Sequence, residues 1–248
     1  MQVHYDETRH LTPSRIYDSR TRRCCGGDHH SSRDCVCDEP DEMSVKLHPL
    51  IQAHPLVSDQ VSTLEVSIIL WQLEELLAKG NRGTVVEFGC YVGTTTLFIR
   101  RLLDQYHHDG PLHVYDSFAG LPTKTPQDTS AAGEQFRPGE LLASKKQLLR
   151  HFYKARLTLP IIHKGWFDGL SSDDVPDEIM LAFLDGDYYE SIRDSLRLIT
   201  PKLASHAVII VDDYANEALP GARRAVDEWS RGRPVKLRVE ASLAIIVT

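Results

Sequence analysis

The stretch Thr84-Val-Val-Glu-Phe-Gly-Cys-Tyr-Val-Gly-Thr-Thr-Thr96 decides the fold of this chain. It starts as a β-branched run, which is typical of a strand, and then breaks at Gly89 and Gly93. The residues that follow, 94–103, place apolar side chains on one face of a predicted helix. Strand, glycine turn and helix together indicate the first unit of a Rossmann-like nucleotide site. An ordinary strand-turn-helix unit is the alternative.

The spacing within this turn indicates what kind of ligand it fits. Gly89 lets the chain turn sharply, and Gly93 lets the helix begin close to a ligand. A dinucleotide fingerprint is G-x-G-x-x-G, and here Tyr91 occupies the position of the middle glycine. A pyrophosphate needs close approach to the backbone at that position, which a tyrosine side chain obstructs. The turn therefore favours a ligand without phosphates and disfavours an NAD-dependent dehydrogenase.

Length and composition set limits on the class of protein. The chain has 248 residues, of which 42% are hydrophobic, so it can build a substantial core in one large or two small domains. No apolar run reaches the roughly 18 residues that a membrane span needs, and the N-terminus lacks the apolar centre of a signal peptide. We therefore expect a cytoplasmic protein without a membrane partner. The net charge of -7 argues against a nucleic-acid partner, although a local basic patch would still allow one.

The N-terminal part of the chain has a different composition. Residues 1–42 carry little apolar patterning, so we expect a disordered tail before a domain that spans residues 43–248. Four of the five cysteines lie in this tail: Cys24, Cys25, Cys35 and Cys37. They could bind zinc with the nearby histidines, but C-x-x-C and H-x-x-x-H spacings are both missing, so a solvated tail with reactive thiols is the preferred interpretation.

Predicted helices and strands alternate through the rest of the chain, which indicates an α/β sheet protein. An extended entry segment is predicted for residues 44–57, and a polar lid or binding loop for residues 120–137. Helices are predicted at residues 62–79, 139–154, 187–200 and from Pro220 onward; strands are predicted at residues 112–118, 157–162, 179–185 and 206–214, followed by an antiparallel hairpin at residues 235–239 and 243–247.

Acidic residues stand at the ends of three predicted strands. They are Asp116, Asp185 and the pair Asp212-Asp213. In open α/β sheets, ligands bind beyond the carboxyl ends of the strands. Asp116 can therefore accept hydrogen bonds from ribose hydroxyls, with a helix or turn cap as the alternative.

The other three acids predict a metal site. They end successive parallel strands, so we expect them to lie close together. Clustered carboxylates repel one another unless a cation neutralises them, and a hard divalent ion with oxygen ligands, Mg²⁺ first of all, resolves that conflict. Such an ion would lower the pKa of a substrate hydroxyl. Asp187 precedes a predicted helix, and we predict that it is an N-cap rather than a metal ligand.

Several segments together resemble one known family. Glu-x-Gly-x-x-x-Gly at residues 87–93 resembles motif I of class I S-adenosylmethionine (SAM) methyltransferases. Over residues 62–231 the chain resembles the macrocin O-methyltransferase (TylF-type) family of Mg²⁺- and SAM-dependent sugar methyltransferases. The segments that carry this resemblance are Val86-Glu-Phe-Gly-Cys-Tyr-Val-Gly93, Val114-Tyr-Asp-Ser-Phe-Ala-Gly-Leu-Pro122, Lys164-Gly-Trp-Phe167, Phe183-Leu-Asp-Gly-Asp-Tyr-Tyr-Glu-Ser191, Val211-Asp-Asp-Tyr214 and Pro220-Gly-Ala-Arg-Arg-Ala-Val226.

The resemblance implies a fold and a set of site residues. The implied fold is a Rossmann-like class I methyltransferase, with a seven-stranded, mostly parallel sheet, an antiparallel last strand and flanking helices. The implied Mg²⁺ ligands are Asp185, Asp212 and Asp213, with Asp185 also the general base. The implied SAM-binding residues are Glu87, Gly89, Tyr91, Gly93, Thr94, Asp116, Ser117, Gly165, Trp166, Phe167 and Asp185. From the sequence alone, Trp166 and Phe167 could stack on adenine or pack in the core.

The implied reaction is transfer of a methyl group to a hydroxyl of a sugar or glycosylated natural product, so the expected partner is a small glycoside or polyhydroxylated acceptor. A catechol-type O-methyltransferase is the closest alternative, but Tyr188 stands where the lysine base of such enzymes would be. A non-catalytic SAM-binding protein is a further alternative, and it has no need of three clustered carboxylates. The sequence leaves the acceptor and the oligomeric state open, a homo-oligomer included.

Overall fold

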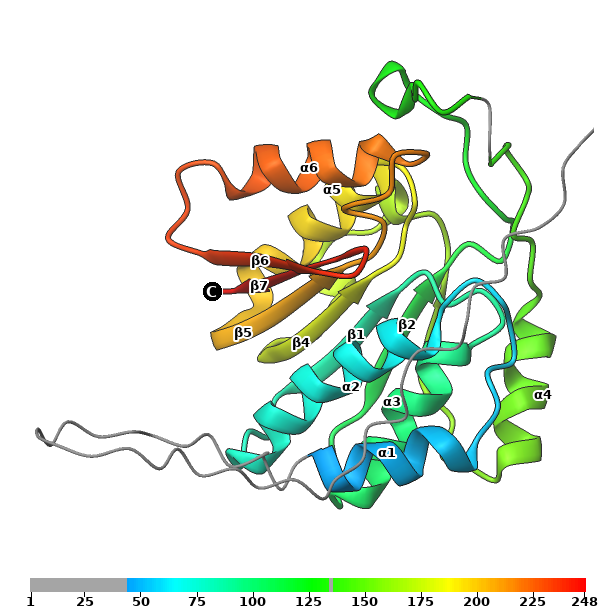
Figure 1. The fold of residues 1–248 in the computed structure, drawn as a ribbon, viewed down its shortest axis with the longest axis vertical. Helices are drawn as coiled ribbons and strands as arrows, with labels where there is room; N and C mark the ends of the chain where they lie inside the picture. Colours follow the sequence, from blue (N-terminus) through cyan, green and yellow to red (C-terminus); the bar gives the residue numbers. More distant parts are fainter. Residues whose placement is uncertain (1–43, 134–135) are drawn as a thin grey trace, which may run out of the picture. The chain divides into compact units, whose positions relative to one another are not determined.

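A computed structural model describes residues 44–133 and 136–248 of the chain (Figure 1). The predictions for residues 1–42, both the disordered tail and its zinc alternative, lie outside the described residues. Within the described part, no helix is long and apolar enough to cross a membrane.

The described residues form a seven-stranded sheet in the order β3-β2-β1-β4-β5-β7-β6. The first five strands in this order pair in parallel, and β7 pairs antiparallel with both β5 and β6. This topology confirms the predicted fold class. The strands are β1 Thr84–Phe88, β2 Leu112–Asp116, β3 Ile161–Lys164, β4 Ile179–Leu184, β5 Leu203–Val211, β6 Lys236–Glu240 and β7 Leu243–Val247.

The order of the parallel strands reverses between β1 and β4, and this reversal positions the site. From β1 the chain goes outward to β2 and β3, and then returns to β4 on the other side. A crevice opens at the carboxyl ends where such a reversal occurs. Backbone hydrogen bonds align these ends: the Asp185 N–H donates to Phe88 O at 2.8 Å, and the Asp212 N–H donates to Leu184 O at 2.9 Å.

Helices cover both faces of the sheet (Figure 1). One apolar cluster joins α1 to α4 with one face, and a second joins α5 and α6 with the other. Val85 and Val86 of β1 belong to different clusters, because successive strand side chains point to opposite faces. The helices are α1 Ser44–Ala53, α2 Thr63–Ala78, α3 Thr94–Gln105, α4 Lys145–Ala155, α5 Tyr189–Ile199 and α6 Pro220–Ser230.

Two sequence predictions about these elements were wrong. The segment predicted to be extended contains helix α1, which includes Pro49. Leu47, Leu50 and Ile51 follow helical spacing and pack against the core, and their burial outweighs the hydrogen bond that the proline removes. The helix predicted from residue 139 begins only at Lys145, after Ser144 caps it by accepting a hydrogen bond from the Gln147 N–H.

Candidate active site

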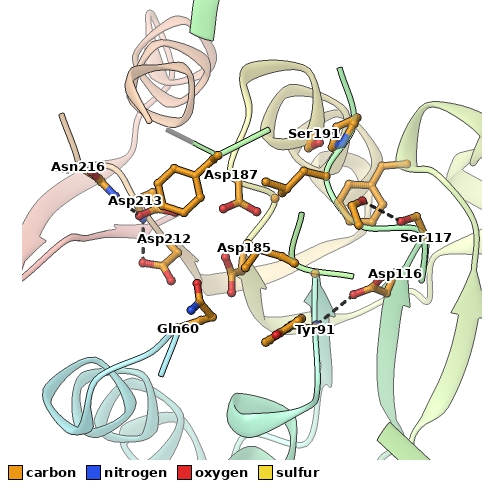
Figure 2. A pocket seen from close by; sticks show the side chains of 18 of the residues that line it. Gln60, Tyr91, Asp116, Ser117, Asp185, Asp187, Ser191, Asp212, Asp213 and Asn216 are labelled. Carbon is orange, nitrogen blue, oxygen red and sulfur yellow. Dashed lines mark hydrogen bonds between the residues drawn. The ribbon is translucent and has the colours of Figure 1, made fainter. Parts of the chain in front are cut away.

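A cavity of about 410 Å³ opens at the carboxyl ends of β1, β2, β4 and β5 (Figure 2). It brings most of the predicted site residues together: Gly89, Tyr91, Asp116, Ser117, Trp166, Phe167, Asp185, Asp212 and Asp213 line it. The other predicted residues, Glu87, Gly93, Thr94 and Gly165, are not among the described residues of its lining. Thr94 is buried, and its hydroxyl lies 2.8 Å from the Ser58 hydroxyl.

The glycine turn is shaped by the protein's own packing. Gly89 has φ 85°, and a Cβ there would lie 1.8 Å from the Asp185 carbonyl oxygen. Gly93 has φ 91°, and a Cβ there would lie 2.3 Å from Leu148 Cδ1 of α4. The sequence interpretation, in which Gly93 makes room for a ligand, missed this contact. Both positions favour glycine because of their positive φ, and at Gly89 the close Asp185 backbone leaves no room for a side chain either.

Asp116 connects the end of β2 to this turn. Its Oδ2 accepts hydrogen bonds from the Cys90 N–H at 2.9 Å and the Tyr91 N–H at 3.1 Å, and its Oδ1 accepts one from the Phe118 N–H at 2.7 Å. Asp116 therefore caps the turn, which is the alternative role considered from the sequence. A carboxylate has about four lone-pair sites, so one remains for a ligand hydroxyl. The carboxylate lines the cavity, which is compatible with the ribose prediction.

Glu87 of β1 is a buried carboxyl group behind the turn. It is 1% exposed, and its Oε2 has no hydrogen-bond partner among the described residues. Burial, with a smaller contribution from Asp116, raises the pKa of Glu87 to about 8. Glu87 is thus held largely protonated at neutral pH and can act as a hydrogen-bond donor there.

Trp166 and Phe167 have different surroundings. Trp166 is 44% exposed and lines the cavity, so its ring has a free face. Phe167 packs against the core, with its ring edge-to-face against Phe88 at a centroid distance of 5.2 Å. The core-packing alternative therefore describes Phe167, and the stacking alternative remains open for Trp166.

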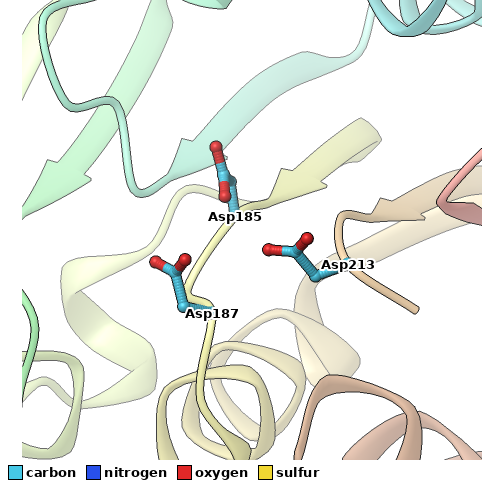
Figure 3. A group of neighbouring side chains, drawn as sticks. All are labelled: Asp185, Asp187 and Asp213. Atoms are coloured by element: carbon cyan, nitrogen blue, oxygen red, sulfur yellow. The ribbon is translucent and has the colours of Figure 1, made fainter. Parts of the chain in front are cut away.

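Three carboxylates form a cluster on the other side of the cavity (Figure 3). Asp185, Asp187 and Asp213 each place an oxygen so that all three atoms lie within 4.8 Å of one another. Asp212 also lines the cavity, but its Oδ1 accepts hydrogen bonds from the Asp213 N–H at 2.8 Å and the Ser242 hydroxyl at 3.2 Å. The structure thus adds Asp187 to the predicted acids, while Asp212 bonds to protein donors.

The N-cap prediction for Asp187 was wrong. The N-cap of α5 is Tyr188, and its side chain makes no capping hydrogen bond. Asp187 lies in a tight turn with φ 59°, where the Tyr188 N–H donates to Gly186 O at 2.6 Å. This turn directs the carboxylate back to the cluster. The Asp185-Gly-Asp187 spacing is the signal that could have found it, because it places a second acid only two residues after the one that follows β4.

The electrostatics of the cluster favour a cation. Burial first, and then the neighbouring carboxylates, raise the pKa of Asp185 and of Asp187 well above the ordinary range. Burial and the Asp213 charge raise the pKa of Asp212 to about 8. A divalent cation would remove this repulsion, and an all-oxygen donor set is the kind that Mg²⁺ prefers. The residues present therefore fit the ion that the sequence predicted.

Other cavity residues were not among the predicted site residues, and several come from segments with no predicted role in a site. Asn216 donates to Asp213 Oδ1 at 2.7 Å, and Ser242 in the hairpin turn bonds to Glu65 of α2. The loop after β2, predicted as a lid or binding loop, supplies an apolar wall. The residues missed are Asp59, Gln60, Glu65, Leu121, Pro122, Phe136, Leu141, Ser191, Asn216 and Ser242.

The sheet topology and the site at its reversal point define the fold of class I methyltransferases. The solved O-methyltransferase NovP has a TM-score of 0.68 to this chain at 22% identity, covering 82% of this chain and 98% of NovP. The calicheamicin methyltransferase CalS11 has a TM-score of 0.62 at 19% identity, covering 89% and 99% of the two chains. At these identities the likeness shows the shared fold.

Sequence comparison then identifies the family. Residues 66–242 match the profile of the macrocin-O-methyltransferase (TylF) family, and the chain belongs to that family. It is 32% identical over 169 residues to a tetracenomycin-C rhamnosyl 4'-O-methyltransferase of Streptomyces olivaceus, covering 65% of this chain and 62% of the relative. It is 29% identical over 165 residues to mycinamicin III 3''-O-methyltransferase of Micromonospora griseorubida, covering 63% and 64%. The chain thus spans less than two thirds of each relative.

Proposed function

We propose that this protein is a SAM- and Mg²⁺-dependent O-methyltransferase that methylates a sugar hydroxyl of a glycosylated small molecule. The observation that carries the proposal is one cavity with two differently built sides. Asp116 and the glycine turn form one side, and the carboxylates of Asp185, Asp187 and Asp213 form the other. A cofactor and an acceptor bound on the two sides would meet in the middle.

The cofactor side has groups suited to a nucleoside. Asp116 would accept hydrogen bonds from ribose hydroxyls, and the free face of Trp166 would stack on adenine. Tyr91 in the turn disfavours a pyrophosphate. SAM fits these features and supplies a methyl group carried on a sulfonium centre.

On the acid side, Asp185, Asp187 and Asp213 would hold the metal ion. The sequence predicted Asp212 as a ligand, and the bonds that Asp212 makes to the Asp213 N–H and the Ser242 hydroxyl favour Asp187 in its place. When bound, Mg²⁺ lowers the pKa of a hydroxyl beside it.

Methyl transfer requires an aligned acceptor oxygen and a base. Asp185 lies at the end of β4 between the two sides, and its carboxylate would take the proton of the attacking hydroxyl. The cavity walls would keep the oxygen in line with the methyl carbon and the leaving sulfur. Positioning of this kind can supply several kcal/mol of the rate enhancement.

The lining of the cavity supports an uncharged acceptor with an apolar portion. Leu121, Phe136 and Leu141 form an apolar wall beside the acids. Among its described lining residues, seven carry carboxylates and none is Lys, Arg or His. These carboxylates outnumber the two charges of one bound Mg²⁺, which disfavours a further phosphate or carboxylate on the acceptor, so we propose a finished glycoside rather than a nucleotide-linked sugar. Relatives named for tetracenomycin-C and mycinamicin III methylation support this choice.

A catechol-type enzyme is the less supported candidate. Tyr188 replaces the lysine base of that class; it is buried, and its hydroxyl donates to Phe136 O at 2.7 Å. A side chain held in this way is a poor substitute for a mobile amine base.

The test is methyl transfer from SAM to neutral glycosides, nucleotide-linked sugars and simple catechols, each with EDTA and with added Mg²⁺. We expect transfer to a neutral glycoside, loss of activity in EDTA and recovery with Mg²⁺. Full activity in EDTA would exclude the metal, and a clear preference for catechols would favour the alternative class.

A further inference from the structure

Asp128 is a buried carboxylate that lies outside the described lining of the cavity. It is 2% exposed and ends the short 3-10 helix Pro126–Asp128 in the loop after β2. Its Oδ2 accepts hydrogen bonds from the N–H and the hydroxyl of Thr125, both at 2.8 Å. These bonds close the local turn. They do not explain why the carboxylate is buried, because a turn of this kind forms equally well in solvent.

The second oxygen of Asp128 reaches a different part of the fold. Oδ1 accepts a hydrogen bond from the Tyr189 N–H at 2.7 Å, and Tyr189 is the first residue of α5. A Cβ on Gly221 would lie 1.9 Å from the same oxygen and 2.6 Å from Tyr189 N. Gly221 belongs to the first turn of α6. One carboxylate therefore lies between two helix N-termini, where a negative charge is stabilised.

This contact adjoins the carboxylate cluster. Asp187 lies two residues before Tyr189, in a backbone conformation with φ 59° that non-glycine residues rarely adopt. Such a conformation persists only where the surrounding structure fixes it. On one side of the turn, the Asp185 N–H bonds to Phe88 O at 2.8 Å. On the other side, Asp128 holds Tyr189.

A second contact joins the same loop to the same turn. The Tyr188 hydroxyl donates to Phe136 O at 2.7 Å, and Tyr188 packs with Leu121 in a small apolar cluster. The loop after β2 thus bonds to two consecutive residues, Tyr188 and Tyr189. Lys124 of this loop lies 5.7 Å from the centre of the Tyr188 ring, but it is Asp128 that binds the backbone at the start of α5.

We propose that Asp128 is a positioning residue for the acceptor side of the cavity. It fixes the start of α5 and so holds the Asp185–Asp187 turn in the conformation that brings the carboxylates of the cluster together. This role rests on the proposed function, because the cluster is the part of the site that serves the acceptor. The hydrogen bonds of Asp128 within the described residues go to Thr125 and Tyr189 and not to Asp116 or the glycine turn, so the cofactor side should not depend on Asp128.

The test compares Asp128→Ala and Asp128→Asn with a matched control, Asp174→Ala. Asp174 ends a similar 3-10 helix, Ser172–Asp174, and its Oδ2 accepts from the N–H and the hydroxyl of Ser171, both at 2.9 Å. It reproduces the local turn chemistry of Asp128 but is exposed, and within the described residues its side chain hydrogen-bonds only to Ser171 and not to α5. The control therefore removes the same type of turn without removing the contact to Tyr189.

Three measurements on the full chain separate positioning from general stability. Amide hydrogen exchange of a peptide covering residues 186–191 should speed up at least tenfold in Asp128→Ala. The dissociation constant for Mn²⁺ as a Mg²⁺ probe, followed by electron paramagnetic resonance, should rise at least fivefold, and the acceptor KM should rise likewise. SAM affinity should stay within twofold. Asp128→Asn should show the same changes at smaller size, and Asp174→Ala should show none.

Unchanged exchange at residues 186–191 in a folded Asp128 variant would overturn the proposal, as would an equal loss of SAM and Mn²⁺ affinity. If Asp128→Ala does not fold, Asp128→Asn decides the matter by the same criteria. If the wild-type chain transfers no methyl group, the proposed function fails. Exchange around Tyr189 then still shows whether Asp128 holds the start of α5.

Discussion

The two sides of the cavity treat their carboxylates in opposite ways. On the cofactor side, the Asp116 carboxylate accepts three backbone hydrogen bonds, which compensate its charge within the protein. On the acid side, burial and neighbouring charges raise the pKa of Asp185 and Asp187, and every cause acts in the same direction. On the first side the protein itself supplies the donors that Asp116 needs. The second requires protons or a cation, which is why it is the side that we assign to metal and acceptor.

The largest expected effect comes from removing Asp185, which should break the acid side alone. Asp185→Ala should lower turnover by about 10²–10⁴-fold or more, because it removes both the proposed base and a proposed metal ligand. SAM affinity should remain nearly intact. Single-turnover methyl transfer and calorimetric titration with SAM check the two expectations, and an active Asp185→Ala enzyme would rule the mechanism out.

Asp116→Ala is the matched change on the cofactor side. It should weaken SAM binding by roughly 1.5–3 kcal/mol, the typical value of a charge-assisted hydrogen bond. Mn²⁺ affinity should change much less, because Asp116 contributes no oxygen to the cluster and acts on it only through its charge. Calorimetry measures both constants in one preparation. Unchanged SAM affinity would show that Asp116 serves only the turn that it caps.

A comparison of Asp187→Asn with Asp212→Asn decides which of these two carboxylates is a metal ligand on the acid side. The geometry places an Asp187 oxygen in the cluster and bonds Asp212 to the Asp213 N–H and the Ser242 hydroxyl. We expect Asp187→Asn to lower Mn²⁺ affinity by about 10–100-fold and Asp212→Asn to have a smaller effect. If Asp212→Asn instead has the larger effect, the metal ligands are the three predicted from the sequence, Asp185, Asp212 and Asp213.

The smallest effect concerns stability between strands β2 and β3, away from the cavity lining, where His113 Nδ1 lies 3.0 Å from His163 Nε2. Burial, and then the His163 charge, lower the pKa of His113 from 6.5 to about 4. His113 in the unfolded chain therefore takes up a proton near pH 6.5, whereas in the folded chain it does so only near pH 4. The folded state thus becomes less stable relative to the unfolded chain as the pH falls from about 6.5 to about 4.

Urea unfolding of the wild type and of a His113 variant, each at pH 7.5 and pH 5, checks this expectation. The two proteins are compared because the acid cluster also titrates in this range and affects both. Between the two pH values, the free energy of unfolding should fall by about 1 kcal/mol more in the wild type than in His113→Asn. This value is small because the His113 ring is partly exposed to solvent. His206→Asn, a change at an exposed histidine, is the control and should follow wild type. Identical losses in wild type and His113→Asn would contradict the shift.

The sequence by itself determined the sheet and much of the cavity. The strand-turn-helix at residues 84–105 and the acids after buried strands are local patterns, and strand ends in an α/β sheet meet at one edge whatever the details. The elements that were misread, α1 and the start of α4, depend on burial against partners distant in the sequence. Periodicity cannot distinguish a buried helix start from a loop such as the one that places Leu141 in the cavity wall.

Only the tertiary structure decided how each acid is used. The sequence predicted Asp212 as a metal ligand at a strand end and Asp187 as an N-cap before a helix, and the fold places them differently. A tight turn directs Asp187 into the cluster, and the Asp213 N–H and the Ser242 hydroxyl hold Asp212. Asp128 gave no sequence signal at all, because its partner Tyr189 lies 61 residues further along the chain. A carboxylate's role depends on which donors and charges surround it, and those come from segments that meet only in the folded chain.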